Sequence, residues 1–224
     1  MITKKPSSGR PLHVRVKTAR GRTVSSQRWL ARQLNDPYVQ QARVAGYRSR
    51  AAYKLIEIDE KFKIFKTGSK VVDLGAAPGG WTQVTLERVG PKGLVVGIDL
   101  VPMEPINGAH LICGDFCDPH VMEELKSSLK SQVNVVLSDM ANSSTGHPQT
   151  DHLRIMALAE EAFAFAQNVL EKGGFFVAKV LRGGTEKELL VLLKKHFEKV
   201  LHFKPPASRA DSAEMYVVAI GFRP

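Results

Sequence analysis

Residues 70–81 read KVVDLGAAPGGW, an apolar run that passes into a glycine-rich turn. Val71 and Val72 are typical of a buried strand, and the glycines after them allow a backbone to approach a bound molecule closely. The N–H groups at the start of a following helix could then bind that molecule. This stretch therefore predicts a strand, a ligand-binding turn and a helix, in that order.

Strand and helix patterns alternate along the rest of the chain. Apolar, β-branched segments predict six further strands, over residues 93–99, 109–116, 134–140, 174–181, 198–204 and 213–222. Helical patterns are expected near residues 80–89, 118–130, 150–171 and 184–197. Such alternation predicts an α/β fold with a mostly parallel seven-stranded sheet and helices on both faces. No helix separates the last two strands, so we expect them to pair antiparallel at one edge.

Positive charge is concentrated at the N-terminal end. Residues 1–54 contain thirteen Lys and Arg and a single acid, Asp36, whereas the other 170 residues carry a net charge of −2. This asymmetry is typical of a protein that binds a polyanion. A mitochondrial transit peptide is the alternative, but the basic character continues to Lys54, within a predicted helix.

Short helices are expected in this basic region. Ser25 and Ser26 are candidate caps of the first, residues 37–47 form a second that stops near Gly46, and Ser49 would cap a third over residues 50–61. The residues before them are predicted to form a basic arm.

Composition excludes several classes of protein. No apolar run approaches the ~18 residues of a membrane-spanning helix, and the N-terminus lacks the apolar core of a secretory signal. Cys113 and Cys117 are expected to be reduced thiols, and two thiols alone cannot build a zinc site. We therefore expect a cytoplasmic monomer without a metal site.

Acidic residues lie at the ends of the first three predicted strands. Asp73 is placed inside the first turn, Asp99 ends the second strand, and Asp115 with Phe116 follows the third. Ligands of open α/β sheets bind at these strand ends, so a dinucleotide such as NAD is one candidate. The turn lacks the G-x-G-x-x-G spacing, however, and Asp73 would repel a phosphate but suit an ammonium. Ribose, adenine and a cationic amino-acid tail together indicate S-adenosylmethionine, although each acid alone could be a helix cap or turn residue.

A lysine interrupts the apolar segment GFFVAKVL, residues 174–181. Burying an ammonium is costly unless it is paired or neutral, so Lys179 is a candidate functional residue. Asp139 ends the adjacent predicted strand, Lys54 lies on the helix before the sheet, and Glu214 opens the last strand. Taken singly, Lys54 and Glu214 could be solvated ends and Asp139 a turn residue.

Several separate motifs resemble one known family. RSRAAYKL, DLGAAPGGW, GDF, SDMA, AKVLRG and SRADSAEMYVVA are similar, in that order, to the FtsJ/RrmJ ribose 2′-O-methyltransferases from about residue 47 to the end. The resemblance implies a Rossmann-like methyltransferase domain over residues 48–224, preceded by the basic arm, residues 1–47. One departure is Asn142, where the family often has a proline.

The resemblance also implies a set of site residues. Its catalytic lysine, aspartate, lysine and glutamate correspond to Lys54, Asp139, Lys179 and Glu214. The cofactor positions implied by the motifs, together with those read from the strand ends, are Asp73, Gly75, Pro78, Gly79, Trp81, Asp99, Asp115, Phe116 and Asp139.

The chemistry of this set predicts a role for Lys179. Burial beside the ammonium of Lys54 would lower the pKa of Lys179 towards that of a general base for a ribose 2′-hydroxyl. A lysine that stays protonated and stabilises the developing alkoxide is the alternative. The implied substrate is a uridine of 23S ribosomal RNA in the assembled 50S subunit. A tRNA anticodon loop, or a non-catalytic RNA-binding role in ribosome assembly, are the other hypotheses.

Overall fold

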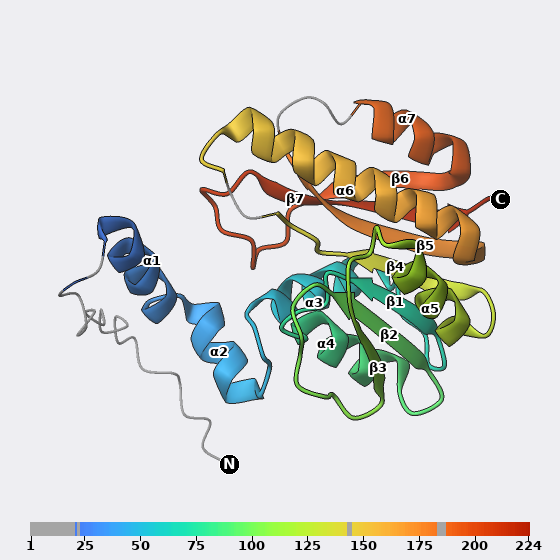
Figure 1. The fold of residues 1–224 in the computed structure, drawn as a ribbon, viewed down its shortest axis with the longest axis horizontal. Helices are drawn as coiled ribbons and strands as arrows, with labels where there is room; N and C mark the ends of the chain where they lie inside the picture. The colour runs from blue at the N-terminus through green and yellow to red at the C-terminus, as the bar shows by residue number, and fades with distance from the viewer. Residues whose placement is uncertain (1–20, 22, 143–144, 183–186) are drawn as a thin grey trace, which may run out of the picture.

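Seven strands form one sheet in the computed structural model, which describes all residues except 1–20, 22, 143–144 and 183–186 (Figure 1). The strands are β1 (Lys70–Leu74), β2 (Leu94–Asp99), β3 (Ala109–Cys113), β4 (Val133–Ser138), β5 (Leu170–Leu181), β6 (Phe197–Phe203) and β7 (Glu214–Phe222). Their spatial order is β3-β2-β1-β4-β5-β7-β6. The first five are mutually parallel, which confirms the predicted α/β class.

Strand β7 runs against its neighbours. It pairs antiparallel with β5 on one side and with β6 on the other, so the last two strands do pair antiparallel at one edge, as predicted. β6 itself is the outermost strand, and β7 is inserted between it and β5. The insertion places the first residue of β7, Glu214, opposite Leu181 near the carboxyl end of β5.

Helices cover both faces of the sheet, since successive strand residues point to opposite sides. Val72 belongs to a core shared with α5 (Pro119–Leu129), α6 (Pro148–Val169) and α7 (Lys187–His196). Val71 belongs to a second core shared with α3 (Ala51–Phe62) and α4 (Gly80–Val89). The continuous apolar strands of the sequence are thus explained by burial on both faces.

Two further helices, α1 (Val24–Leu34) and α2 (Pro37–Ala45), extend to one side of the sheet (Figure 1). α2 ends at Gly46 in a left-handed conformation with φ of 79°, which confirms the predicted stop. The predicted caps of the other two helices are wrong. Thr23 caps α1, because the helix begins at Val24 and places Ser25 and Ser26 inside its first turn.

The predicted cap at Ser49 is also wrong. α3 begins after Arg50 without a side-chain cap, and the buried Ser49 Oγ has no hydrogen-bond partner among the described residues. The reason is packing, because a Cβ built on Gly80 would lie 2.4 Å from Ser49 Oγ. Residues 1–20 and 22 of the predicted basic arm lie outside the described residues, and the division at residue 47 stays a prediction.

Candidate active site

The loops after β1 and β4 lie against each other at the carboxyl end of the sheet. Asp139 N donates to Leu74 O at 3.1 Å, and a Cβ built on Gly75 would come within 2.8 Å of the Met140 backbone. Gly75 also has a φ of 78°, which side chains rarely adopt. Glycine is therefore required at position 75 for this close approach.

A pocket of about 100 Å³ opens beside Gly75. Of the predicted cofactor residues, Gly75, Asp99, Asp115 and Phe116 line it. Its volume is below the roughly 300 Å³ typical of pockets for drug-sized molecules, so it matches one part of a nucleoside. Residues 140–142, from the loop after β4, form the wall that would have to shift to admit the rest of such a ligand.

Backbone N–H groups hold the two carboxylates of this pocket. Asp99 Oδ2 accepts from Ala77 N and its Oδ1 from Val101 N, both at 2.9 Å. Asp115 Oδ1 accepts from Cys117 N, also at 2.9 Å. Because a carboxylate oxygen has about two acceptor positions, both residues keep acceptors for the hydroxyl or amino groups of a ligand.

Pro78, Gly79 and Trp81, also predicted as cofactor residues, are not among the residues that line this pocket. Trp81 is buried, its Nε1 donates to Ala51 O at 2.8 Å, and its ring centroid is 5.5 Å from that of Tyr216. Gly79 precedes α4, whose first N–H groups have no partner within the helix. Any ligand contact of Trp81 in this conformation would therefore come from its backbone.

Arg48 joins the loops after β1 and β2, a role that the sequence motifs did not predict. Its guanidinium donates to Pro78 O at 3.4 Å, to Glu104 O at 2.7 Å and to Pro105 O at 2.9 Å. Arg48 thereby holds the loop after β1 and the loop after β2 together.

Asp73 lies within β1 and is fully buried, so its predicted position inside the turn is wrong. Thr82 Oγ1 donates to Asp73 Oδ2 at 2.7 Å, whereas Oδ1 has no partner among the described residues. Burial raises the pKa of Asp73 to about 7, with Asp139 and Asp99 adding to the rise and the Thr82 hydrogen bond opposing it. The carboxylate does not line the pocket in this conformation.

The four predicted catalytic residues come together at the ends of β4, β5 and β7. Lys179 Nζ lies 3.1 Å from Asp139 Oδ1 and donates to Asp139 O at 2.6 Å. Lys54 Nζ, from α3, pairs with Glu214 Oε1. The lysine side chains are only 8% and 13% exposed for Lys179 and Lys54, so both ammonium groups depend on these partners.

Tyr216 links the two ion pairs, and the sequence analysis missed it. Its hydroxyl lies 2.8 Å from Asp139 Oδ1 and 3.1 Å from Glu214 Oε1, and it accepts from Lys54 Nζ at 3.3 Å. Burial, followed by the two carboxylates, raises the pKa of Tyr216 well above its ordinary value, so the phenol stays protonated. The available signal was its position two residues after Glu214, which places both side chains on one face of the strand.

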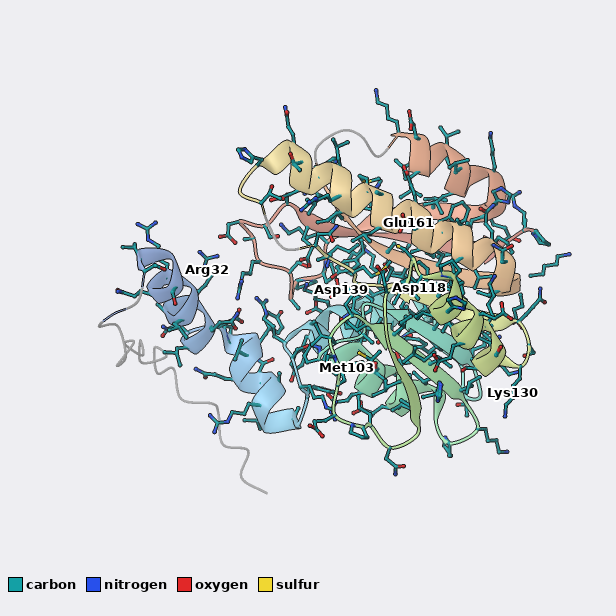
Figure 2. All side chains as sticks on the ribbon, viewed as in Figure 1. Arg32, Met103, Asp118, Lys130, Asp139 and Glu161 are labelled. Atoms are coloured by element: carbon teal, nitrogen blue, oxygen red, sulfur yellow. The ribbon has the colours of Figure 1, made fainter. Side chains whose placement is uncertain are left out.

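Asp139 lies near the middle of the molecule (Figure 2). Burial acts to raise its pKa, but Lys179, Lys54 and the Tyr216 hydrogen bond outweigh burial and hold the pKa below its ordinary value. The cluster therefore brings two lysine side chains, two carboxylates and a phenol together, an arrangement suited to orienting a hydroxyl and handling its proton.

Other chemistry receives little support from the described residues. Among them, no group of three His, Cys, Asp or Glu side chains is placed to hold a metal, and no helix has the length and apolar character to cross a membrane. Cys113 and Cys117 are free thiols. A hydrogen bond to Glu161, together with burial, raises the pKa of Cys117 to about 12, so this thiol is a poor nucleophile.

Comparison with known proteins places these observations in context. The model of the FtsJ-like methyltransferase family matches residues 47–222. The chain is 58% identical, over 94% of its length and 78% of the relative, to ribosomal RNA large subunit methyltransferase E of Gluconobacter oxydans. It is 57% identical to the protein of that name in Cereibacter sphaeroides, with 99% and 96% of the two chains covered. The resemblance predicted from the sequence motifs is confirmed.

Solved structures agree with this assignment. A ribosomal RNA methyltransferase from Plasmodium falciparum matches with a TM-score of 0.71 and 33% identity, covering 79% of this chain and 98% of that chain. The fibrillarin/Nop5p complex matches with a TM-score of 0.53 and 17% identity, covering 76% of this chain and 83% of that chain. The second likeness is one of fold alone, and both confirm the Rossmann-like fold.

Proposed function

Because the chain belongs to the FtsJ-like methyltransferase family, we propose that it methylates a ribose 2′-hydroxyl of large-subunit ribosomal RNA with S-adenosylmethionine. One observation carries the proposal. Lys54, Asp139, Lys179 and Glu214 come from separate segments and meet in one cluster of ion pairs and hydrogen bonds, next to the pocket that Met140 helps to line. A binding protein without turnover would not need two buried lysines held in this way.

The pocket residues fit the proposed cofactor. Asp99 has acceptors left for ribose hydroxyls, Asp115 for the adenine amino group, and Phe116 offers an apolar surface for the base. Gly75 lines the pocket without a side chain that would reduce its volume. S-adenosylmethionine supplies a methyl group on a positively charged sulfur, which makes that carbon open to attack.

Lys179, in its neutral form, is proposed to accept the proton of the 2′-hydroxyl. The hydroxyl oxygen would bond to the methyl carbon as the bond between that carbon and the sulfur breaks and the sulfur keeps the electron pair. Asp139, which contacts Lys179 through both a side-chain and a backbone oxygen, holds that amine in place. Lys54 and Glu214 then position the hydroxyl from the other side, with Tyr216 between the two pairs. A protonated Lys179 that stabilises the alkoxide is the second candidate, and the pH dependence of single-turnover rates separates the two.

The proposed substrate rests on the relatives and on charge. Relatives that are 58% and 57% identical to the chain over the aligned residues are named ribosomal RNA large subunit methyltransferase E. The basic residues 1–54 supply cations for RNA phosphates, which supports the proposed arm over residues 1–47. A uridine of 23S RNA in the assembled 50S subunit is the specific target that we propose.

A monomer working in the cytoplasm, where ribosomal subunits are found, is part of the same proposal. Its support is that Lys54, Asp139, Lys179, Glu214 and Tyr216 all come from one chain, so the cluster needs no second copy.

Methyl transfer from labelled S-adenosylmethionine tests the proposal. The protein is offered 50S subunits, free ribosomal RNA and bulk tRNA separately, and the modified nucleotide is mapped in whichever accepts label. We expect label in 50S subunits, on a uridine ribose. Preferential labelling of tRNA would favour an anticodon-loop substrate, and the absence of label in all three would favour a non-catalytic RNA-binding protein.

A further inference from the structure

A groove of about 580 Å³ separates α1 and α2 from the loop between β6 and β7. Its lining includes three arginines from three parts of the chain, Arg32 on α1, Arg50 before α3 and Arg209 in the β6–β7 loop, and we call it the arginine groove. Figure 1 shows that loop on the same side of the molecule as α1 and α2, and Figure 2 labels Arg32 on α1.

Two arginines of the arginine groove are close in sequence to members of the catalytic cluster. Arg50 is four residues before Lys54, and Arg209 is five residues before Glu214. Lys54 and Glu214 form one of the two ion pairs of the cluster. A strand of RNA lying in the groove would therefore pass close to the residues that we propose act on its ribose.

Asp36 fixes the walls of the groove. Its Oδ2 lies 2.6 Å from Arg50 Nη1 and 3.3 Å from Arg209 Nη2, and its Oδ1 accepts from Tyr38 N at 3.0 Å. The only acid of residues 1–54 thus joins α2 to the start of α3 and to the β6–β7 loop. Because Asp36 is 8% exposed, these bonds are shielded from water.

A second set of hydrogen bonds attaches the β6–β7 loop to α3 and the residue before it. Arg50 Nη2 donates to Ala207 O, and Ala207 N donates to Glu57 Oε2 at 2.7 Å. The loop is therefore attached to α3 through its backbone as well as through Arg209. The groove is a built feature of the fold rather than a gap beside a loose loop.

Three arginines and two aspartates line the groove, so its charged side chains have a net positive charge. Arg32 is exposed and makes no hydrogen bond or ion pair within the described part of the chain, and Arg209 uses only one of its five donors there. Asp36 is already occupied, which leaves the exposed Asp211 as the other carboxylate of the lining. A ligand rich in acceptors and negative charge, such as a phosphodiester, complements this surface.

The aromatic side chain of the groove is already engaged. The Tyr38 ring lies 5.6 Å from the Arg50 guanidinium carbon and 5.5 Å from the Tyr53 ring. A base would have to compete with these neighbours to stack on Tyr38. The surface therefore favours contact with a sugar–phosphate backbone over contact with a base.

The geometry points to the arginine groove as the seat of the RNA backbone next to the target nucleotide. This inference rests on the proposed function and adds where the substrate strand runs. Arg32 and Arg209 contact its phosphates, while the Asp36 bonds keep the groove aligned with Lys54 and Glu214. Each phosphate neutralised by an arginine releases counterions, so the contact is measurable as salt dependence.

The test compares two variants that remove the same charge. Arg32→Gln acts inside the groove, whereas Lys92→Gln removes an exposed cation of the loop before β2, outside both the groove lining and the basic arm. Binding of fluorescently labelled free 23S RNA is titrated over a salt series for the full-length proteins. We expect Arg32→Gln to weaken binding about 3- to 10-fold and to lower the slope of log affinity against log salt by about one. Lys92→Gln should change affinity less than about two-fold.

A steric variant tests the groove without a change of charge. Ala31→Trp, also in the lining, should fill part of the groove and weaken RNA binding at least as much as Arg32→Gln. Its binding of S-adenosylmethionine, measured by calorimetry, should match that of the wild type and shows that the domain is folded.

Equal losses in Arg32→Gln and Lys92→Gln, with normal RNA binding by Ala31→Trp, would overturn the inference. Methyl transfer by the wild-type protein is measured in the same preparation. If the wild type transfers methyl groups to RNA and none of the groove variants impairs this transfer, the inference about the groove is wrong and the proposed function stands. If the wild type transfers no methyl group to RNA, the proposed function itself is contradicted.

Discussion

The pKa values of two carboxyl groups at neighbouring strand ends, the buried Asp73 and the partly buried Asp139, are shifted in opposite directions. Asp73 in β1 and Asp139 just after β4 lie at neighbouring strand ends, yet the pKa of Asp73 is raised to about 7 and that of Asp139 is lowered. Burial acts to raise both values. The difference comes from partners, because Asp139 contacts Lys179 and Tyr216 whereas Asp73 has one neutral donor, Thr82.

The two halves of the sheet surround their carboxyl groups with different partners. On the side of β5 and β7, cations and a phenol hold a carboxylate in its charged form, ready to position a hydroxyl and an amine. Inside β1, the carboxyl group of Asp73 is kept partly neutral near pH 7 and takes no part in the lining of the pocket. Four predictions test this difference, from the largest expected effect to the smallest.

Removing the cation beside Asp139 should have the largest effect. Lys179→Ala should lower turnover by about 10²- to 10⁴-fold, the range for loss of a general base, and should leave S-adenosylmethionine binding within a few-fold. It should also raise the pKa of Asp139, because burial raises that pKa and Lys179 is the main group that lowers it. A turnover assay beside a calorimetric titration measures both effects. Lys172→Ala, an exposed lysine of the same strand, is the control, and near-normal turnover in Lys179→Ala would assign Lys179 a structural role.

Asp73 should make the cofactor-free protein less stable as pH rises. A carboxyl group whose folded pKa is raised keeps its proton longer in the folded state, so its contribution is complete below about pH 4 and is lost as pH rises through about 7. Asp73→Asn lacks this loss and should gain about 2–4 kcal/mol over the wild type between pH 4 and pH 8. Urea unfolding at several pH values measures it.

The control for Asp73 is Asp211→Asn, which changes an exposed acid. Its stability should run parallel to that of the wild type across the same pH range. If Asp73→Asn ran parallel as well, Asp73 would titrate as an ordinary aspartate and the contrast with Asp139 would disappear.

Asp99 is a third carboxylate at a strand end and extends the comparison of Asp73 with Asp139. Two backbone N–H groups donate to Asp99, whereas the hydroxyl of Thr82 donates to Asp73. Asp99→Ala should weaken S-adenosylmethionine binding by about 1.5–3 kcal/mol, the scale of hydrogen bonds to a charged group. Glu104→Ala, an exposed acid of the same loop, should bind normally in the same calorimetric titration. Tighter binding of NAD than of S-adenosylmethionine by the wild type would make the cofactor assignment wrong.

The smallest effect is expected at Tyr216. Tyr216→Phe keeps the ring against Trp81 and removes the hydroxyl shared by Asp139, Glu214 and Lys54. One hydrogen bond contributes about 0.5–1.5 kcal/mol, so turnover should fall about 2- to 10-fold with cofactor affinity unchanged. A loss as large as that of Lys179→Ala would mean that the phenol takes a direct part in the proton transfer.

The sequence by itself determined the order and type of the elements. Apolar runs bounded by glycine predicted the strands, because a strand that is buried on both faces needs apolar residues at nearly every position. The end of α2 at Gly46 follows from the conformational freedom of that one residue. Lys179 could be recognised as functional because an unpaired ammonium inside such a run is too costly to be accidental. Motifs at separate positions supplied the other three members of the catalytic set.

Only the tertiary structure decided which partners those residues have. Lys54 and Glu214 are 160 residues apart, and the insertion of β7 beside β5 is what brings Tyr216 between the two ion pairs. Nor does a local pattern distinguish Asp73 from Asp139, or reveal that Asp36 joins Arg50 to Arg209. Burial and long-range charge pairs set these properties, and both depend on segments that the fold brings together from distant parts of the chain.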